Sequence, residues 1–185
     1  PRQSMEPRVV QTILQALTEE QGSQLVFLPG LAEIRRVQSQ LEDQLGHSGD
    51  VVIAPLHGEL DLAAQRLALS PAEKGQRKIV LATSIAQTSL TIEGIRVVID
   101  AGLIRQPSFD PVSGLTRLQT RRVSQAAAEQ RAGRAGRLEP GVCYRLWSLS
   151  QQEQMAAQDQ PEILQADLAP LALQLAQWGI QEANE

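Results

Sequence analysis

One segment of this 185-residue chain, residues 130–137, reads QRAGRAGR and combines arginines with residues that have almost no side chain. If the segment is helical, Gln130, Arg134 and Arg137 stand at positions i, i+4 and i+7, which is one face of the helix. Planar guanidinium groups on one face can bind phosphate oxygens in bidentate fashion, and they stay charged at any relevant pH. A glycine in a helix interior costs about 1 kcal/mol relative to alanine, so two of them suggest that another surface comes close. We therefore predict a phosphate-binding face; the alternative is an arginine-rich surface helix.

A second candidate for phosphate binding consists of two hydroxyl side chains, Thr83 and Ser84, which follow an apolar run at 78–82. That run is typical of a buried strand, and open α/β sheets bind their ligands at the carboxyl ends of the strands. Hydroxyl and backbone N–H groups in this place can hold the phosphates of a single nucleic-acid strand without reading its bases. The alternative is helix capping, which we would favour if the arginine motif were absent from the chain.

The charge of the chain is distributed unevenly. The net charge is −4, yet residues 105–137 hold seven arginines against Asp110 and Glu129, about +5 over one segment. Such a patch can attract phosphates, although a solvated surface explains it equally well. No basic residue follows Arg145, so the C-terminal part is an acidic tail.

Composition limits the classes of protein to consider. Hydrophobic residues make up 42% and charged residues 21% of the chain, as in an ordinary globular domain. The single cysteine, Cys143, excludes an internal disulfide and fits a reducing compartment, so we expect a cytoplasmic location. No apolar run approaches the roughly 18 residues of a membrane span. Cys143 lies in a strand-like run and is interpreted as a core residue, while His47 and His57 are interpreted as loop or surface residues without metal-ligand partners.

The elements that must position these residues alternate between helices and short apolar strands. This alternation predicts an α/β fold with a mainly parallel sheet. Helical periodicity occurs at 9–17, 31–41 and 62–69, and strands are predicted at 24–28, 51–54, 78–82 and 96–100. Between Ile104 and Arg122 the sequence predicts an inserted β-hairpin, with a turn at 110–114. We expect one domain over residues 1–150, and an acidic linker and helix over 151–185 that lead into a following domain.

Four segments together resemble the motifs of superfamily 2 helicases of the DEAH/RHA group. Residues 130–137 resemble motif VI and residues 83–95, reading TSIAQTSLTIEGI, resemble motif V. Residues 25–30 resemble motif IV, and 56–60 resemble the segment that follows the next strand. Order and spacing resemble the second RecA-like domain over residues 1 to about 150. The hairpin sequence and the residues after motif VI are most similar to the bacterial HrpB-type helicases.

The resemblance implies a RecA-like domain of the P-loop NTPase type and assigns roles to individual residues. Gln130, Arg134 and Arg137 would face the γ-phosphate of ATP, the two arginines as arginine fingers, a contribution worth on the order of 10³–10⁵ in rate. Ser89 and Glu93 would also face the nucleotide. The nucleic-acid contacts would come from Thr83, Ser84, Arg121 and Arg122.

The implied partners are ATP, Mg²⁺, single-stranded RNA, a first RecA-like domain and following C-terminal domains of winged-helix type. The chain has neither a Gly-Lys-Ser/Thr loop nor an Asp-Glu-Ala-His box, so the first RecA-like domain would hold Mg²⁺, and this fragment alone is expected to be inactive. Two other readings stay open: a non-catalytic RNA-binding module, and a DNA-directed helicase of the same superfamily.

Three positions depart from the pattern of the group. Ser84 replaces the usual Asn of motif V, and Gln87 replaces the usual Glu. Ala68 stands where relatives often have an aromatic residue that stacks on the adenine, so we expect weak recognition of the base.

Overall fold

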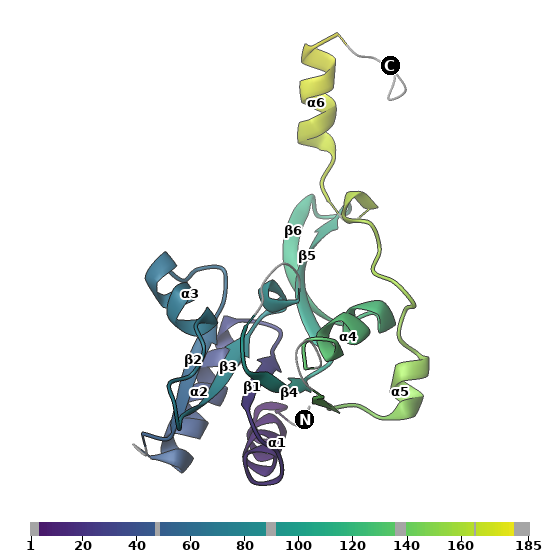
Figure 1. Cartoon of the computed structure of the whole chain (residues 1–185). Coiled ribbons are helices and arrows are strands. Elements are labelled where there is room, and N and C mark those ends of the chain that lie inside the picture. The colour runs from purple at the N-terminus through teal and green to yellow at the C-terminus, as the bar shows by residue number, and fades with distance from the viewer. Residues whose placement is uncertain (1–3, 47–48, 88–91, 136–139, 165, 180–185) are drawn as a thin grey trace. The chain divides into compact units, whose positions relative to one another are not determined.

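The computed structural model describes residues 4–46, 49–87, 92–135, 140–164 and 166–179. Its centre is a parallel sheet of five strands in the order β2-β3-β1-β4-β7 (Figure 1). Their bounds are Ser23–Phe27 (β1), Val51–Leu56 (β2), Arg77–Ala82 (β3), Ile95–Asp100 (β4) and Val142–Arg145 (β7). All five strands are parallel, which confirms the predicted α/β class.

One face of the sheet is covered by two helices, α1 (Glu6–Glu19) and α2 (Leu31–Leu45). Their apolar residues recur at helical spacing and meet alternate residues of the strands, because side chains of a strand alternate between its two faces. The core on this face is aliphatic and fully buried, with Ile13, Leu41 and Ile99 at 0% exposure. The helices predicted at 9–17 and 31–41 are thereby confirmed, each a few residues longer than the sequence indicated.

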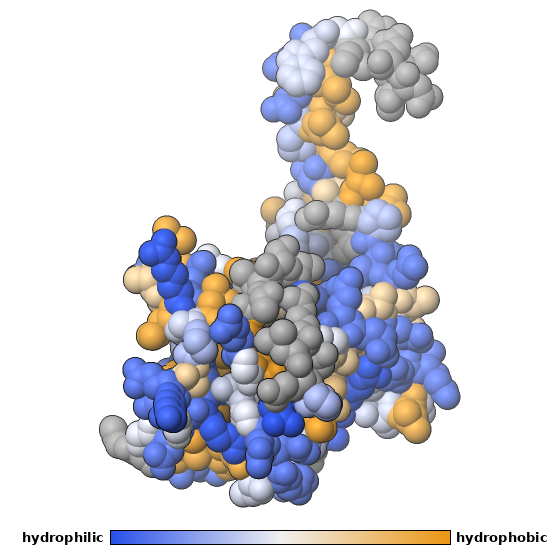
Figure 2. Space-filling model, in the orientation of Figure 1, coloured by the Kyte–Doolittle hydropathy of each residue, from blue (hydrophilic) through white to orange (hydrophobic). Residues whose placement is uncertain are grey.

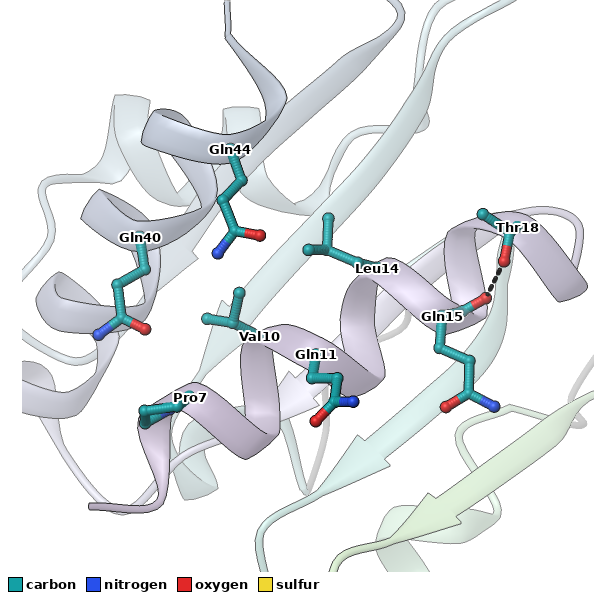
Figure 3. Close-up of a pocket in the computed structure, with 8 residues that line it drawn as sticks. All are labelled: Pro7, Val10, Gln11, Leu14, Gln15, Thr18, Gln40 and Gln44. Carbon is teal, nitrogen blue, oxygen red and sulfur yellow. Dashed lines mark hydrogen bonds between the residues drawn. The ribbon is translucent and has the colours of Figure 1, made fainter. Parts of the chain in front are cut away.

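Between the outer surfaces of α1 and α2 lies a groove of about 430 Å³ (Figure 3). Apolar side chains from α1 line it together with glutamines from both helices: Pro7, Val10, Gln11, Leu14, Gln15, Thr18, Gln40 and Gln44. The groove belongs to the face of the sheet that carries none of the candidate site residues named above.

The opposite face of the sheet is covered more thinly. A short helix, α3 (Leu62–Leu69), a single 3₁₀ turn, η1 (Ser84–Ala86), and Ala135 pack there on alternate residues of the strands. Asp61 caps α3, since its carboxylate accepts a hydrogen bond from the N–H of Ala64 at 2.7 Å. Three of the covering residues are alanines, Ala68, Ala86 and Ala135, and all three are buried.

A third cluster of buried side chains fixes α4 (Gln125–Ala132), the helix that begins motif VI. Val123, Ala127 and Ala128 pack against Trp147 and Met155. The segment after β7, which includes α5 (Leu149–Glu153), also bonds the first turn of α4: the N–H groups of residues 125 and 126 donate to the carbonyls of residues 156 and 157 at 2.8 and 3.1 Å. The segment beyond residue 150 thus supplies partners for backbone groups that a helix start leaves unpaired.

The predicted hairpin is present as β5 (Leu103–Asp110) and β6 (Leu115–Arg122). Its turn is built by Asp110, whose carboxylate accepts from the N–H of Val112 and the hydroxyl of Ser113 at 3.0 and 2.7 Å. Gly114 completes the turn with a φ of +65°, a conformation that glycine adopts without strain. All eight residues of β6 are exposed.

By packing, the chain divides into two units. The first contains residues 1–104 and 121–159, and the second contains 105–120 and 160–185. The second unit includes η2 (Glu162–Leu164) and α6 (Ala169–Gln177), whose exposed apolar surface is visible in Figure 2 and includes Leu171 and Leu173. The domain bounds expected from the sequence stay a prediction. No described helix is long and apolar enough to cross a membrane.

Candidate functional site

Helix α4 carries the start of the arginine motif and ends inside it. Ser124 caps its N-terminus, accepting from the N–H of Ala127 at 3.0 Å, and the last helical residue is Ala132. Beyond it the N–H groups of Arg134 and Ala135 donate to the carbonyls three residues before them, at 3.1 and 3.0 Å, which is a tight turn and not α-helix. The expectation that Gln130 and Arg134 share one helical face is therefore wrong. Arg137 and Ser89 lie outside the described residues.

The chain brings Gln130 and Arg134 together by another route, through Gln87 of the motif V segment. The side-chain Nε2 of Gln87 donates to Oε1 of Gln130 at 3.1 Å. The backbone carbonyl of Gln87 accepts a hydrogen bond from the guanidinium of Arg134. Two residues predicted to face the γ-phosphate thus converge on one glutamine, which stands where the group usually has a glutamate.

Gly133 lies in the turn at the end of α4, and nothing within the described chain requires a glycine there. A methyl group at this position would lie 3.5 Å from the carbonyl oxygens of Glu129 and Gln130, which is an ordinary contact. The position is exposed. The close approach that the sequence suggested is therefore not made by the described part of the chain itself.

Arg131, the arginine between the two, is buried and not part of a surface patch. Its side chain and that of Asp100 are both 0% exposed, and the guanidinium Nη1 donates to Oδ1 of Asp100 at 2.9 Å. Nη1 also donates to the carbonyl of Leu103 at 3.3 Å, and the guanidinium lies over the ring of Phe27, 4.8 Å from its centroid. The inclusion of Arg131 in a phosphate-attracting surface is wrong, because its charge is neutralised in the core.

Asp100 is the functional neighbour that the sequence interpretation missed. It ends the otherwise apolar strand β4, and a carboxylate at the end of a buried strand, with an arginine motif later in the chain, was the available signal. Burial raises the pKa of Asp100, while the charge of Arg131 and a 2.8 Å hydrogen bond from the N–H of Gly102 act in the opposite direction. The opposing effects of Arg131 and Gly102 favour the carboxylate, so we treat the pair as ionic.

Thr83 and Ser84 lie at the carboxyl edge of the sheet, as the sequence predicted. Thr83 follows β3 in extended conformation, and its N–H donates to the carbonyl of Leu56 at 3.2 Å. Both residues are half-buried, and Thr83 makes no side-chain capping bond to η1. The capping alternative therefore has no support at Thr83.

Glu93 lies at the other edge of the sheet, in the turn that precedes β4, where it is exposed. The carbonyl of its neighbour Gly94 accepts from the N–H of Ser23 at the start of β1, at 3.0 Å. Ala135 packs near the same edge, on Ile95, the first residue of β4. The sheet thus separates Thr83 and Ser84 from Glu93 by the full length of a strand.

Arg121 and Arg122 end β6 and are exposed. The next residue, Val123, donates its N–H to the carbonyl of Gly102 at 3.1 Å, which ties the base of the hairpin to the chain just after β4. The two arginines that precede Val123 are thus held near the segment that follows β4.

The sequence matches the model of the helicase conserved C-terminal domain over residues 7–139. The chain belongs to this helicase family. It is 53% identical over 180 residues to the ATP-dependent RNA helicase HrpB of Escherichia coli (strain K12), covering 97% of this chain and 22% of that protein. It is 42% identical over 178 residues to the probable ATP-dependent RNA helicase DHX34 of Homo sapiens, covering 94% and 16%.

Solved structures give the same answer for the helicase domain. The crystal structure of the Escherichia coli DEAH/RHA helicase HrpB superposes with a TM-score of 0.92 at 53% identity, covering 98% of this chain and 23% of that one. The chain thus spans about a fifth of the length of these relatives. The resemblance to the second RecA-like domain of DEAH/RHA helicases, and to the HrpB type within them, is confirmed.

Two further expectations concern single side chains of the helicase domain. Ala68 is 1% exposed and packs in the core between α3 and the sheet, so an aromatic ring at this position in the present arrangement would not be free to stack on a base. Weak recognition of the base stays a prediction. Cys143 is partly buried against the core, and burial raises the pKa of its thiol to about 11, which disfavours the nucleophilic thiolate.

Proposed function

We propose that the chain is the second motor domain of a full-length ATP-dependent RNA helicase. In this proposal Gln130, Arg134 and Arg137 complete an ATP site, and Thr83 and Ser84 hold the backbone of single-stranded RNA. The observation that supports it most directly is the convergence of Gln130 and Arg134 on Gln87, at the point where the motif V segment passes the end of α4.

The chemistry asked of Arg134 and Arg137 is electrostatic. In phosphoryl transfer, charge spreads over the equatorial oxygens of the γ-phosphoryl group, and positioned guanidinium groups stabilise it. Arginine suits this role because its charge does not titrate and its planar fork matches phosphate. Mg²⁺ would be held mainly by the first RecA-like domain. Among the residues that the structure describes, no three Asp, Glu, His or Cys side chains are grouped so that they could hold a metal ion.

The exposed turn at Gly133 supports the proposal that another domain or the nucleotide packs on it. Because no described residue fills the space beside Gly133, the glycine is consistent with close packing of a first RecA-like domain or of the bound nucleotide. ATP would then lie between the two domains, and the following C-terminal domains would come after the linker and helix at 151–185. A cytoplasmic location remains part of the proposal.

The grip on RNA would lie at the opposite edge of the sheet from Glu93. Backbone phosphates carry no sequence information, so Thr83 and Ser84 would hold RNA of any sequence. Arg121 and Arg122 would add salt-dependent attraction. Gln87 follows Ser84 by three residues in the chain, so movement of Gln130 and Arg134 on nucleotide binding would act directly on the segment that grips RNA.

The test is a comparison of two variants of the full-length protein. Arg134→Lys keeps the charge but loses the planar fork, so we expect RNA-stimulated ATP turnover to fall by a factor of about 10³ or more, with little change in RNA affinity without nucleotide. Arg122→Ala should instead weaken RNA binding and reduce its dependence on salt, with turnover at saturating RNA maintained. Normal turnover by Arg134→Lys together with loss of RNA binding would favour a non-catalytic RNA-binding module.

A further inference from the structure

The guanidinium of Arg131 donates three hydrogen bonds, two from Nη1 and one from Nε, to three residues of the chain. Nη1 bonds Asp100 at the end of β4 and the carbonyl of Leu103 at the start of β5, at 2.9 and 3.3 Å. Nε donates to Oε1 of Gln87 at 3.1 Å. The face of the guanidinium also lies over the ring of Phe27 at the end of β1, so the group is held from several sides.

The side chain of Gln87 is oriented by the hydrogen bond that it accepts from Arg131. Its amide oxygen accepts from Arg131, so its amide nitrogen must point to Oε1 of Gln130. The backbone carbonyl of the same residue accepts from Arg134. One side chain therefore has to accept and donate at once, which a neutral amide can do and an ionised carboxylate cannot.

We propose that Arg131 is a positioning residue that fixes Gln87, and that Gln87 sets where Gln130 and Arg134 stand. Arg131 touches neither nucleotide nor RNA in this arrangement; it acts through Gln87 alone. The amide of Gln87 links the buried arginine to the side chain of Gln130. The inference rests on the proposed function, since it concerns the geometry of the same ATP site.

Lysine could not replace Arg131 in this position. An ammonium group could pair with Asp100, but it is a single point and lacks a donor equivalent to Nε of arginine. Arg131→Lys therefore removes the bond to Gln87 while keeping a positive charge beside Asp100. Gln87→Met makes the complementary change: it keeps a side chain of similar length, removes both amide bonds and leaves the Arg131–Asp100 pair intact.

The test is a double-mutant cycle in the full-length protein, with ATP turnover measured at saturating RNA and corrected for the folded fraction. We expect Arg131→Lys and Gln87→Met each to lower kcat by roughly tenfold, the size of one hydrogen bond to a charged group, with KM for ATP changing less. The double variant should lie within about twofold of the slower single variant, because both changes interrupt one connection. Losses that multiply to about a hundredfold would overturn the inference.

Two further variants separate the possible failures. Arg145→Lys is the matched control: Arg145 also bonds α4, through Glu129 at 2.8 Å, but does not contact Gln87, so kcat should stay within about twofold of the wild type. Arg134→Lys reports on the proposed function itself. If Arg134→Lys abolishes turnover while Gln87→Met keeps the wild-type kcat, the positioning role is wrong and the ATP site stands. If Arg134→Lys keeps wild-type turnover, the proposed ATP site is wrong, and the positioning role that rests on it is overturned with it.

Discussion

The two faces of the central sheet differ in what they bury. The face under α1 and α2 buries aliphatic side chains such as Ile13, Leu41 and Ile99 at full depth. The other face is covered by α3, one 3₁₀ turn and the end of motif VI, and near it lies the fully buried pair of Arg131 and Asp100. The first face is mainly aliphatic, with a half-exposed arginine, Arg36 of α2, bonded to Glu6 of α1 at 2.5 Å, whereas the second has an ion pair in which both side chains are fully buried.

This difference separates the stability of the domain from the geometry of its site. Apolar burial is non-directional and roughly proportional to area, so the aliphatic core under α1 and α2 can stabilise the fold without fixing the position of a polar side chain on the opposite face. A buried ion pair contributes little net stability compared with a well-packed apolar core, yet it is costly to break. The Arg131–Asp100 pair therefore defines where Gln87 stands more than it stabilises the sheet.

The largest effect on stability is expected when one partner of the buried pair is removed. Asp100→Ala leaves the guanidinium of Arg131 in the core without its carboxylate, which should cost about 3–5 kcal/mol. Hydrogen exchange of the peptide that covers β1, measured in the full-length protein, reports this loss. Asp100→Asn is the control, since its amide oxygen can still accept from Arg131 and the cost should be smaller. Equal protection in the wild type and Asp100→Ala would mean that the pair is dispensable.

An apolar truncation on the other face should separate stability from activity. Leu41→Ala removes a fully buried side chain from α2 and should cost about 2–5 kcal/mol. Because Leu41 has no contact with the motif V or motif VI segments in its core cluster, ATP turnover per folded molecule should be unchanged. Leu67→Ala, at a position 66% exposed, should change stability by less than about 0.5 kcal/mol. A loss of turnover in folded Leu41→Ala would show that the two faces are not independent.

The sequence allowed much of the α1–α2 face to be predicted and less of the other. Periodicity placed α1, α2 and the first four parallel strands within a few residues, because burial imposes a repeat that the sequence must follow. The end of α4 could not be predicted from the spacing, because residues 130, 134 and 137 keep the same spacing in the sequence whether or not the helix continues past Ala132. Arg131 was assigned to the surface for a similar reason: its burial depends on Asp100, 31 residues earlier in the chain. Partners at such separations leave no local pattern.

The smallest expected effect concerns Cys143 in β7, the edge strand of the sheet. Burial raises the pKa of its thiol from 9.0 to about 11, so the neutral thiol is favoured and the thiolate forms only as the pH rises towards that value. At pH 8 about 10% of a thiol with a pKa of 9.0 is ionised, but only about 0.1% of a thiol with a pKa of about 11. Because the thiolate is the nucleophile, alkylation of Cys143 by iodoacetamide should be about a hundredfold slower than for a free thiol. Mass spectrometry of the peptide that contains Cys143 measures this rate, and the same peptide in denaturant is the control. The rate should recover as the pH approaches 11, following the titration of the thiol. A rate at pH 8 equal to that of the denatured peptide would show that the edge of the sheet opens readily. The side chain of Cys143 would then not be protected by the core cluster on its face of the sheet.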